Sequence, residues 1–254
     1  MADEYGQAYT IVNGKITYEF TASTSFTVPS GGDIQIEAYG SAGTTGGSNG
    51  SYNIPGGKGA YVIGTLNGVT QGEILTVTAG GGVSGKAADV RRGGTGLNNR
   101  IIVAGAGGGS PYLSSNYYPN YVNLSSGADS GSSRTYSGRA GTQSAGGAGI
   151  YGGSNGTFGY GGSGTGNGGD GWYGGGGGGY YSDTSSSGTT TNRMTGGGGG
   201  SSYIGSLTNA SIVEGQNTGE AKVIITILNS APSITISSPA DNQTLLQVTR
   251  LASS

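Results

Sequence analysis

The chain of 254 residues contains no cysteine and no histidine. Without cysteine there is no disulfide, no thiolate nucleophile and no thiolate metal site, and without histidine the usual proton shuttle and the commonest metal ligand are missing too. These two absences remove much of the chemistry on which enzymes depend. We therefore expect a non-enzymatic protein with no metal site and no cofactor.

Charge is also scarce, because charged residues make up only 9% of the chain and the formal net charge is −2. A nucleic-acid-binding or membrane-surface protein carries a basic patch, so we expect neither partner. No apolar run is long enough to span a bilayer, so we expect no membrane insertion. Met1–Glu4 lacks the basic and apolar regions of a secretory signal. Two origins stay open: release from a cytoplasm as part of a particle, or a piece of a longer secreted protein.

Glycine is abundant, with 59 copies, and hydrophobic residues amount to only 32% of the chain. Such a composition alone would indicate a low-complexity, disordered chain. Disorder usually comes with many charges and few aromatic residues, however, whereas this chain has few charges and 17 tyrosines. Uncharged glycine interspersed with tyrosine is typical of extracellular structural or adhesive material.

Two strand-forming regions stand near the start of the chain. Ala8–Phe20 places Asn13-Gly14 between two alternating runs, and this dipeptide tolerates the positive φ angles of a two-residue turn, so a β-hairpin is predicted. Asp33–Tyr39 alternates apolar and polar residues, with Ile34, Ile36 and Ala38 on one face. This pattern predicts a half-buried strand.

Further strands are predicted downstream. Ala60–Leu66 and Glu73–Thr78 are expected to form a pair joined by a turn through Asn67-Gly68. Arg100–Ala104 is apolar over consecutive positions, which predicts burial on both faces, and Ala221–Leu228 is a clear strand. The chain between these last two shows no strand pattern, and no helical stripe of useful length occurs anywhere. The predicted class is all-β, a sandwich or barrel with one modest core and essentially no α-helix.

The glycine-rich stretch from 146 to 205 has neither helical nor strand periodicity, and its centre is the run Gly174–Gly179. A polyproline-II-type helix has three residues per turn and no internal hydrogen bonds, so its backbone groups can pair with neighbouring helices when no side chain intervenes. Only glycine permits such close backbones. The stretch is therefore expected to be ordered if strands hold its ends in place.

Seven short sequence segments, taken in order, resemble those of a known family. The segments are Phe26–Pro29, Ile36–Gly43, Gly56–Leu66, Gly72–Val77, Ala88–Arg91, Asn99–Gly109 and Gly196–Gly205. Together they resemble the glycine-rich domain in the extracellular part of anaplastic lymphoma kinase and leukocyte tyrosine kinase receptors and in many bacterial and phage surface proteins. The resemblance covers roughly Phe20 to Leu228.

The resemblance implies a β-sandwich of the jelly-roll type, similar to tumour necrosis factor, with an inserted bundle of polyglycine-II helices at about 105–205. The structural core of that bundle is expected to comprise Gly174, Gly175, Gly176, Gly177, Gly178, Gly179, Gly196, Gly197 and Gly198. The domain organisation follows: residues 1–25 form a hairpin and lead-in, and residues 26–228 form the glycine-rich sandwich. Residues 229–254 are expected to form a linker or the start of an immunoglobulin-like module, and truncation of that module stays an open alternative.

Eight aromatic residues are candidate contacts for a ligand or partner. Flat aromatic faces beside Ser, Asn and Gly suit the recognition of a sugar or a protein. Four lie in the insert Pro111–Val122, which has no evident place in a strand: Tyr112, Tyr117, Tyr118 and Tyr121. Four flank the longest glycine run: Trp172, Tyr173, Tyr180 and Tyr181. For the second group an alternative stays open, in which they cap the glycine helices and seal the bundle against the sandwich.

The remaining charged candidates are predicted to have structural roles and not catalytic or ligand-binding ones. Asp89 with Arg91 and Arg92 can contact an anionic ligand, but a structural device between a strand and the glycine helices is the preferred interpretation. Asp170 and Asp183 are two carboxylates in the central stretch. Glycoside hydrolysis needs a cleft with perturbed pKa values and a calcium site needs six or more oxygen ligands, and nothing near these residues in the sequence supports either.

The function that these features favour is a structural or adhesive module of a bacterial cell surface or virion tail, and hence extracellular. Its expected partner is a cell-surface glycan or protein. The alternative is a subunit that assembles with other copies of itself into a homo-trimer or filament. Receptor-like binding of a protein ligand is less favoured, because the chain lacks the cysteines and the membrane segment of the receptors.

Overall fold

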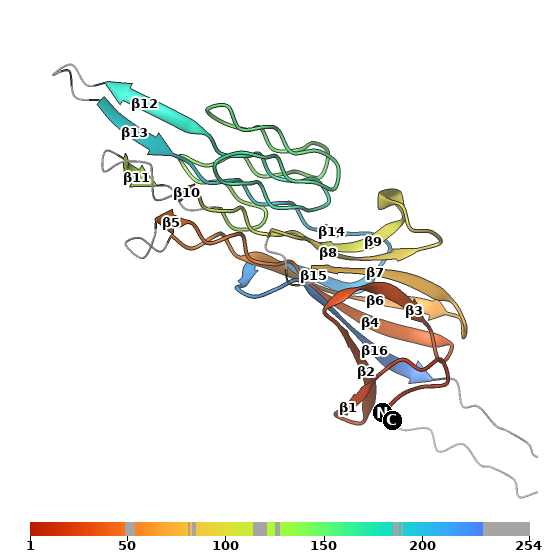
Figure 1. The fold of residues 1–254 in the computed structure, drawn as a ribbon. Helices are drawn as coiled ribbons and strands as arrows, with labels where there is room; N and C mark the ends of the chain where they lie inside the picture. Colours follow the sequence, from red (N-terminus) through yellow and green to blue (C-terminus); the bar gives the residue numbers. More distant parts are fainter. Residues whose placement is uncertain are drawn as a thin grey trace, which may run out of the picture.

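The structure is a computed structural model that describes residues 1–48, 54–80, 82, 85–113, 121–124, 128–184, 188 and 190–230. It is almost entirely β, and its two large sheets are antiparallel and pack face to face (Figure 1). In the described part of the chain, the only helical element is a single 3-10 turn, η1 (Leu97–Asn99). The predicted all-β class is confirmed.

The first large sheet has six strands, in the order β1 (Thr10–Val12), β2 (Lys15–Phe20), β16 (Lys222–Ser230), β4 (Gly32–Tyr39), β6 (Gly59–Val69) and β15 (Thr208–Asn217). The second has five strands, in the order β14 (Tyr203–Ile204), β9 (Arg100–Ala104), β8 (Ala88–Arg92), β7 (Ile74–Gly80) and β3 (Ala22–Thr27). In the first sheet β16, the last described strand, lies between β2 and β4. This sheet is therefore complete only when the chain on both sides of the glycine-rich region has come together.

Two small sheets complete the described strands. One joins β5 (Gly47–Ser48) to β10 (Tyr112–Leu113) in parallel. The other contains β11 (Tyr121–Leu124), β13 (Thr190–Met194) and β12 (Tyr180–Thr184), in that order. Both lie away from the sandwich core, in the part of the molecule that contains the glycine-rich segments between β9 and β14 (Figure 1). We call this part the glycine-rich half.

The core lies between the two large sheets and is built by alternation along their strands. In β4, Ile34, Ile36 and Ala38 are buried, as predicted, while the residues between them are half-buried on the outer face. Each sheet therefore contributes one apolar face. The fully buried large side chains are Tyr18, Phe26, Val28, Ile34, Ile36, Val62, Leu75, Val77, Val90, Ile102, Val103 and Ile225.

The hairpin prediction at the start of the chain is confirmed. β1 pairs with β2 in antiparallel register, with Val12 opposite Lys15, and the two turn residues Asn13 and Gly14 have φ angles of 50° and 76°. A turn with two positive φ angles matches the right-handed twist of the strands it joins. The Asn-Gly dipeptide thus determines this local structure.

The predicted pairing of the next two strands is wrong. β6 continues through Asn67 and Gly68 to Val69, and the chain turns only at Thr70–Glu73. β6 pairs with β4 and β15, whereas β7 pairs with β3 and β8 in the other sheet. The turn residues are a weak local signal, because packing across the core decides which sheet each strand joins.

The expectation of no strands between Ala104 and Ala221 is also wrong. β15 is a ten-residue strand, and β12 and β13 form an antiparallel ribbon. β15 lies at the edge of its sheet and is largely exposed, so its sequence does not alternate cleanly. The two strands of the ribbon have the sequences Tyr-Tyr-Ser-Asp-Thr and Thr-Thr-Asn-Arg-Met, which do not alternate between apolar and polar residues and therefore give no periodic signal.

β9 is buried on both faces, as its unbroken apolar sequence predicts. Ile102 and Ala104 belong to the core cluster, and Val103, whose side chain points the other way, is also fully buried. β14 pairs with the free edge of β9 in the same sheet, and the Arg100 side chain of β9 donates to the Gly171 carbonyl of a glycine-rich segment. This strand is therefore the place where the sandwich meets the glycine-rich half.

The run Gly174–Gly179 is fully surrounded by other segments of the chain. All six glycines are buried. Successive amides donate to different neighbours, and every third amide returns to the same one. The donor–acceptor pairs are Gly174–Thr157 and Gly177–Ser154 on one side, Gly175–Gly169 and Gly178–Gly166 on a second, and Gly176–Arg139 on a third, each 2.8 or 2.9 Å long.

The carbonyls of the same run accept hydrogen bonds from three other segments, and every third carbonyl accepts from the same segment. The pairs, with the amide donor first, are Gly147–Gly174 and Ile150–Gly177, Gly162–Gly175 and Thr165–Gly178, and Gly198–Gly176 and Thr195–Gly179, between 2.8 and 3.1 Å long. Three segments thus accept hydrogen bonds from the run and three others donate to it. The run satisfies its buried backbone groups entirely through neighbours that are distant in sequence.

We predict that Gly176→Ala destabilises the protein by about 3 kcal/mol or more, because the added methyl group would overlap the backbone carbonyl of Ala148 and no flexible side chain can move aside. Gly219→Ala is the matched control, since Gly219 is exposed and its nearest neighbour would be 3.5 Å from the methyl group. The control is expected to change stability by less than about 0.5 kcal/mol. Urea unfolding measures both, and equal stability of the two variants would contradict the tight packing.

Candidate recognition surface

The glycine-rich half and the N-terminus lie at opposite ends of an elongated molecule (Figure 1). The N-terminal segment is held to the sandwich because Asp3 accepts hydrogen bonds from the Gln7 amide at 2.8 Å and from the Tyr18 hydroxyl at 2.9 Å. The end of β16 lies in the same region, where Ser230 pairs with Gly32. The ribbon of β12 and β13 lies at the other end.

Of the four aromatic residues that flank the glycine run, two lie at the junction with the sandwich. The Trp172 ring stacks on Tyr203 of β14, with 3.9 Å between ring centroids and an interplanar angle of 11°. Its indole N–H donates to the Gln143 carbonyl at 3.2 Å. Tyr173 and Trp172 both contact the edge or face of Phe158, at 5.2 and 4.9 Å between centroids. These two residues therefore occupy the place that the sealing interpretation assigns to them.

A buried arginine that the sequence did not single out holds this junction together. Arg100, at the start of β9, is only 4% exposed, and its guanidinium carbon lies 4.7 Å from the centroid of the Phe158 ring and 4.8 Å from the centroid of the Trp172 ring. It donates to the carbonyls of Leu97, Gly171 and Trp172 at 2.9, 2.7 and 3.1 Å. Burial lowers the pKa of the Arg100 guanidinium, which starts high enough for the group to stay charged at neutral pH.

The Asp89 and Arg91 pair is a structural device, but it does not reach the glycine segments. Arg91 binds Asp89 through two hydrogen bonds of 2.7 and 3.1 Å, and its other nitrogen donates to the Thr95 carbonyl in the loop before β9. The hydrogen bond to Asp89 raises the pKa of Arg91. Arg92 instead pairs with Glu73 at 2.6 Å. The bonds from an arginine to the glycine segment come from Arg100.

The other two flanking aromatic residues, Tyr180 and Tyr181, open β12 at the far end of the glycine run. Tyr180 is 45% exposed. The Tyr181 ring stacks on Tyr151, with 4.7 Å between centroids and an interplanar angle of 29°, and Tyr151 itself is 42% exposed. The backbone amide of Tyr180 donates to the Tyr151 carbonyl at 3.1 Å. The four flanking aromatics thus separate into two at the junction and two on the distal surface.

The cross-strand neighbour of Tyr181 is Arg193 of β13. Its guanidinium carbon lies 5.6 Å from the centroid of the Tyr136 ring, and Tyr136 is 41% exposed. Tyr151, Tyr181, Arg193 and Tyr136 therefore follow one another across the distal surface, each in contact with or directly opposite the next. We call these four residues, together with Tyr180, the distal patch.

The insert that carries the other four tyrosines is described only in part. β10 begins at Tyr112, and β11 begins at Tyr121, whose backbone pairs with Asn192 of β13. The insert thus has two short strands, contrary to the expectation of none, and one of them extends the ribbon that bears the distal patch. Tyr117 and Tyr118 lie outside the described residues.

Sequence reasoning missed Tyr136, Tyr151 and Arg193 as members of this surface. None of the three has another aromatic residue beside it in the sequence, so none was noticed as part of an aromatic cluster. The two tyrosines could nevertheless have been predicted to be exposed. A large side chain does not fit between closely packed glycine backbones, so an isolated tyrosine in such a region lies at its surface.

A cleft of about 380 Å³ lies on the glycine-rich half, between the segments that contain Thr44, Lys86, Ser163 and Asn167. Asp170 lines it and is already engaged, because its carboxylate accepts hydrogen bonds from Lys86 Nζ and the Gly161 amide, each at 2.9 Å. Among the described residues, no group of three or more acidic side chains is arranged to hold a metal ion. In the same residues, no helix is long and apolar enough to cross a membrane.

No family model matches the chain, and no curated protein sequence matches it.

We predict that Arg100→Gln destabilises the protein by about 3 kcal/mol, because several buried carbonyls lose their only charged donor and the two rings lose the cation between them. Arg100→Lys should restore little, since a point charge cannot reproduce the planar group that lies between Phe158 and Trp172. Urea unfolding followed by far-ultraviolet circular dichroism measures this. Full rescue by lysine would show that charge alone matters at this site.

Proposed function

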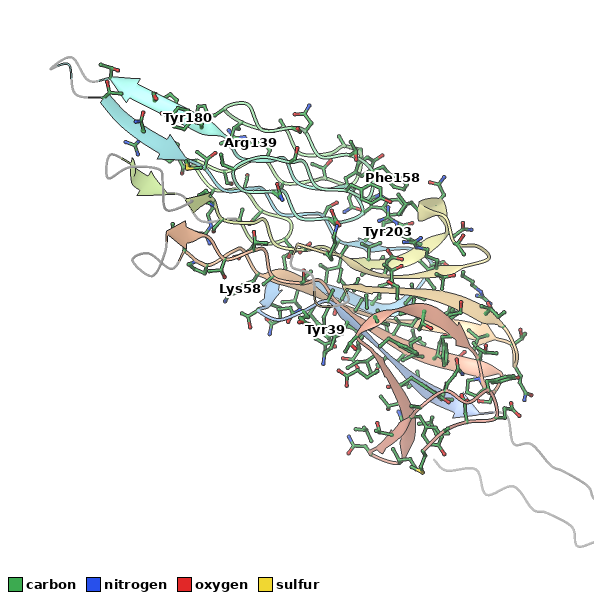
Figure 2. All side chains as sticks on the ribbon, viewed as in Figure 1. Tyr39, Lys58, Arg139, Phe158, Tyr180 and Tyr203 are labelled. Atoms are coloured by element: carbon green, nitrogen blue, oxygen red, sulfur yellow. The ribbon has the colours of Figure 1, made fainter. Side chains whose placement is uncertain are left out.

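We propose that this chain is a non-enzymatic adhesive module of a bacterial surface or phage tail structure, and that it works outside the cell. The observation that carries the proposal is the position of the distal patch. Exposed tyrosines gather at the end of the glycine-rich half, remote from the N-terminus and the end of β16 (Figures 1 and 2). Attachment through the sandwich end leaves these rings facing outward, where they bind a cell-surface glycan or protein.

We further propose that the glycine segments are polyglycine-II helices. The support is the three-residue repeat of hydrogen bonds around Gly174–Gly179, its six neighbouring segments, and the lack of bonds within the run. Similar close approaches surround Gly196, Gly197 and Gly198, which are also buried. Such a lattice is stiff because every segment is bonded sideways, so it suits a support for a recognition surface.

We also propose a sandwich of the tumour necrosis factor type and membership of the glycine-rich domain family described above. The support is the strand order, in which β16 lies between β2 and β4 and the glycine-rich half is inserted between β9 and β14. This fold serves different functions in different proteins, so the functional proposal rests on the distal patch and not on the family.

We predict that a Tyr180→Ala/Tyr181→Ala variant binds its target cells about tenfold more weakly or worse, because aromatic anchors dominate such contacts. Tyr5→Ala is the matched control, since Tyr5 is 44% exposed but belongs to the N-terminal segment. The assay measures binding of labelled protein to a panel of bacterial cells and to their purified surface glycans. Equal loss in both variants, or no loss in either, would contradict the proposed site. Changing Tyr112, Tyr117, Tyr118 and Tyr121 to alanine tests the insert separately.

Self-assembly is the second candidate, and the exposed edge of the six-stranded sheet favours it. β15 pairs with β6 on one side only, and it exposes Ile212 and Val213 at 39% and 44%. A long edge strand with apolar side chains is a template for pairing with another copy.

Assembly through β15 predicts that the protein forms trimers or filaments and that Val213→Lys converts them to monomers, because a charge at the edge opposes strand pairing. Light scattering after size-exclusion chromatography measures the mass over a range of concentrations. Ile74→Lys is the control, since Ile74 is exposed on the other sheet. A wild-type protein that stays monomeric at every concentration would rule this candidate out.

A further inference from the structure

The insertion between β9 and β14 carries few charges. Between residues 105 and 202 the chain has three arginines, Arg134, Arg139 and Arg193, and three aspartates, Asp129, Asp170 and Asp183, so the formal charge of this stretch is zero. Asp170 is paired with Lys86 on the cleft. The positive charge of this half is therefore concentrated in its arginines.

Two of these arginines lie on neighbouring parallel segments, with Arg139 beside Gly198, five residues along from Arg193. Ser137 and Gly196 form a parallel bridge, and the Gly138 amide donates to the Gly196 carbonyl at 2.9 Å, so the segments with Arg139 and Arg193 lie side by side. The amide of Arg139 also donates to the Ala148 carbonyl at 2.9 Å, in the segment that ends with Tyr151. Figure 2 shows Arg139 and Tyr180 on the same half of the molecule.

Among the side chains that the structure describes, the ion pairs join Lys86 to Asp170, Arg91 to Asp89, Arg92 to Glu73 and Lys222 to Glu19, and none of them includes Arg139 or Arg193. The Arg139 side chain is exposed, and the half-buried Arg193 places its guanidinium over the face of Tyr136. An exposed guanidinium can donate hydrogen bonds to a ligand. The arginines on the sandwich, in contrast, are paired or buried.

The tyrosine rings supply the second half of a binding chemistry. The stacked pair of Tyr151 and Tyr181 presents a flat apolar surface, and Tyr136 presents another on the far side of Arg193. Pyranose rings pack on such faces, while guanidinium groups bind carboxylates through two parallel hydrogen bonds. The spacing along an extended surface suits several consecutive sugar units better than a single small molecule.

We propose that the distal patch, together with Arg139, binds a carboxylated saccharide such as a uronic or sialic acid polymer. Tyr151, Tyr181 and Tyr136 stack on the sugar rings, and Arg139 and Arg193 bind the carboxylates. This inference rests on the proposed adhesive function and names the ligand class of the same surface. An acidic protein would offer the same charges without the pyranose faces, so the saccharide is favoured by the aromatic half of the site.

The test compares oligogalacturonate and polysialic acid with their methyl esters, which keep the sugar rings and remove the negative charge. Polyglutamate serves as an acidic polymer without sugar. Biolayer interferometry with the whole chain should show that each acidic saccharide, or one of the two, binds about tenfold more tightly than its ester and than polyglutamate. Added salt should narrow the difference, because exposed charges are screened.

Arg139→Gln and Arg193→Gln should each reduce the preference for the acid over the ester, while Arg193→Lys should keep part of it. Lys15→Gln removes one positive charge at the sandwich end, where Lys15 is exposed in the β1–β2 hairpin, and it should leave the preference unchanged. Thermal unfolding of all variants excludes loss of structure as the cause. An equal effect of Lys15→Gln would show non-specific attraction and overturn the assignment.

The outcomes separate the ligand class from the function. If ester and acid bind equally, the patch binds neutral sugars and this inference is wrong, although adhesion stands. If polyglutamate binds as tightly as the saccharides, the partner is an acidic protein. Binding to cells without binding to either acidic saccharide overturns the ligand class alone. No binding to cells or to any of these polymers overturns the proposed function as well.

Discussion

Hydrogen bonding between backbones that carry no side chains is the constraint on which this structure depends. A buried amide or carbonyl must find a partner, and in the run Gly174–Gly179 the partners come from other segments that surround it. Adding a side chain anywhere along this run would separate two backbones. The abundance of glycine is therefore a requirement of close packing, and the entropy that each glycine loses on folding is offset by bonds on every side.

At the boundary of such a lattice the backbone amides and carbonyls have no further glycine segment to pair with. They must form hydrogen bonds with water or with another part of the protein. At one end the sandwich supplies that cover through Arg100, whose guanidinium donates to the Gly171 and Trp172 carbonyls just before the glycine run and lies near the rings of Phe158 and Trp172. At the other end the chain leaves the lattice in the β12–β13 ribbon, where Tyr180 is exposed. The same residue type, an aromatic ring beside glycine, thus serves packing at one end and is available for contact at the other.

The sequence predicted the elements whose pattern is local. Asn13-Gly14 determined a hairpin, and the alternation in Asp33–Tyr39 determined a half-buried strand. It failed where the information is not local. The exposed edge strand β15 has no apolar face to reveal it, and the assignment of β6 and β7 to different sheets depends on packing across the core. The sequence did not single out Arg100, because Phe158, Gly171 and Trp172, which it contacts at the junction, lie more than fifty residues away along the chain.

By itself the sequence determined the all-β class, the lack of thiol and imidazole chemistry, and the need for glycine between close backbones. The tertiary structure decided which aromatics are packed and which are exposed. Trp172 and Tyr181 flank the same glycine run, yet one stacks on Tyr203 at the junction and the other on Tyr151 at the far end. The physical reason is that a side chain's surroundings in this protein are other segments, brought beside it by backbone hydrogen bonds that leave no periodic trace in the sequence.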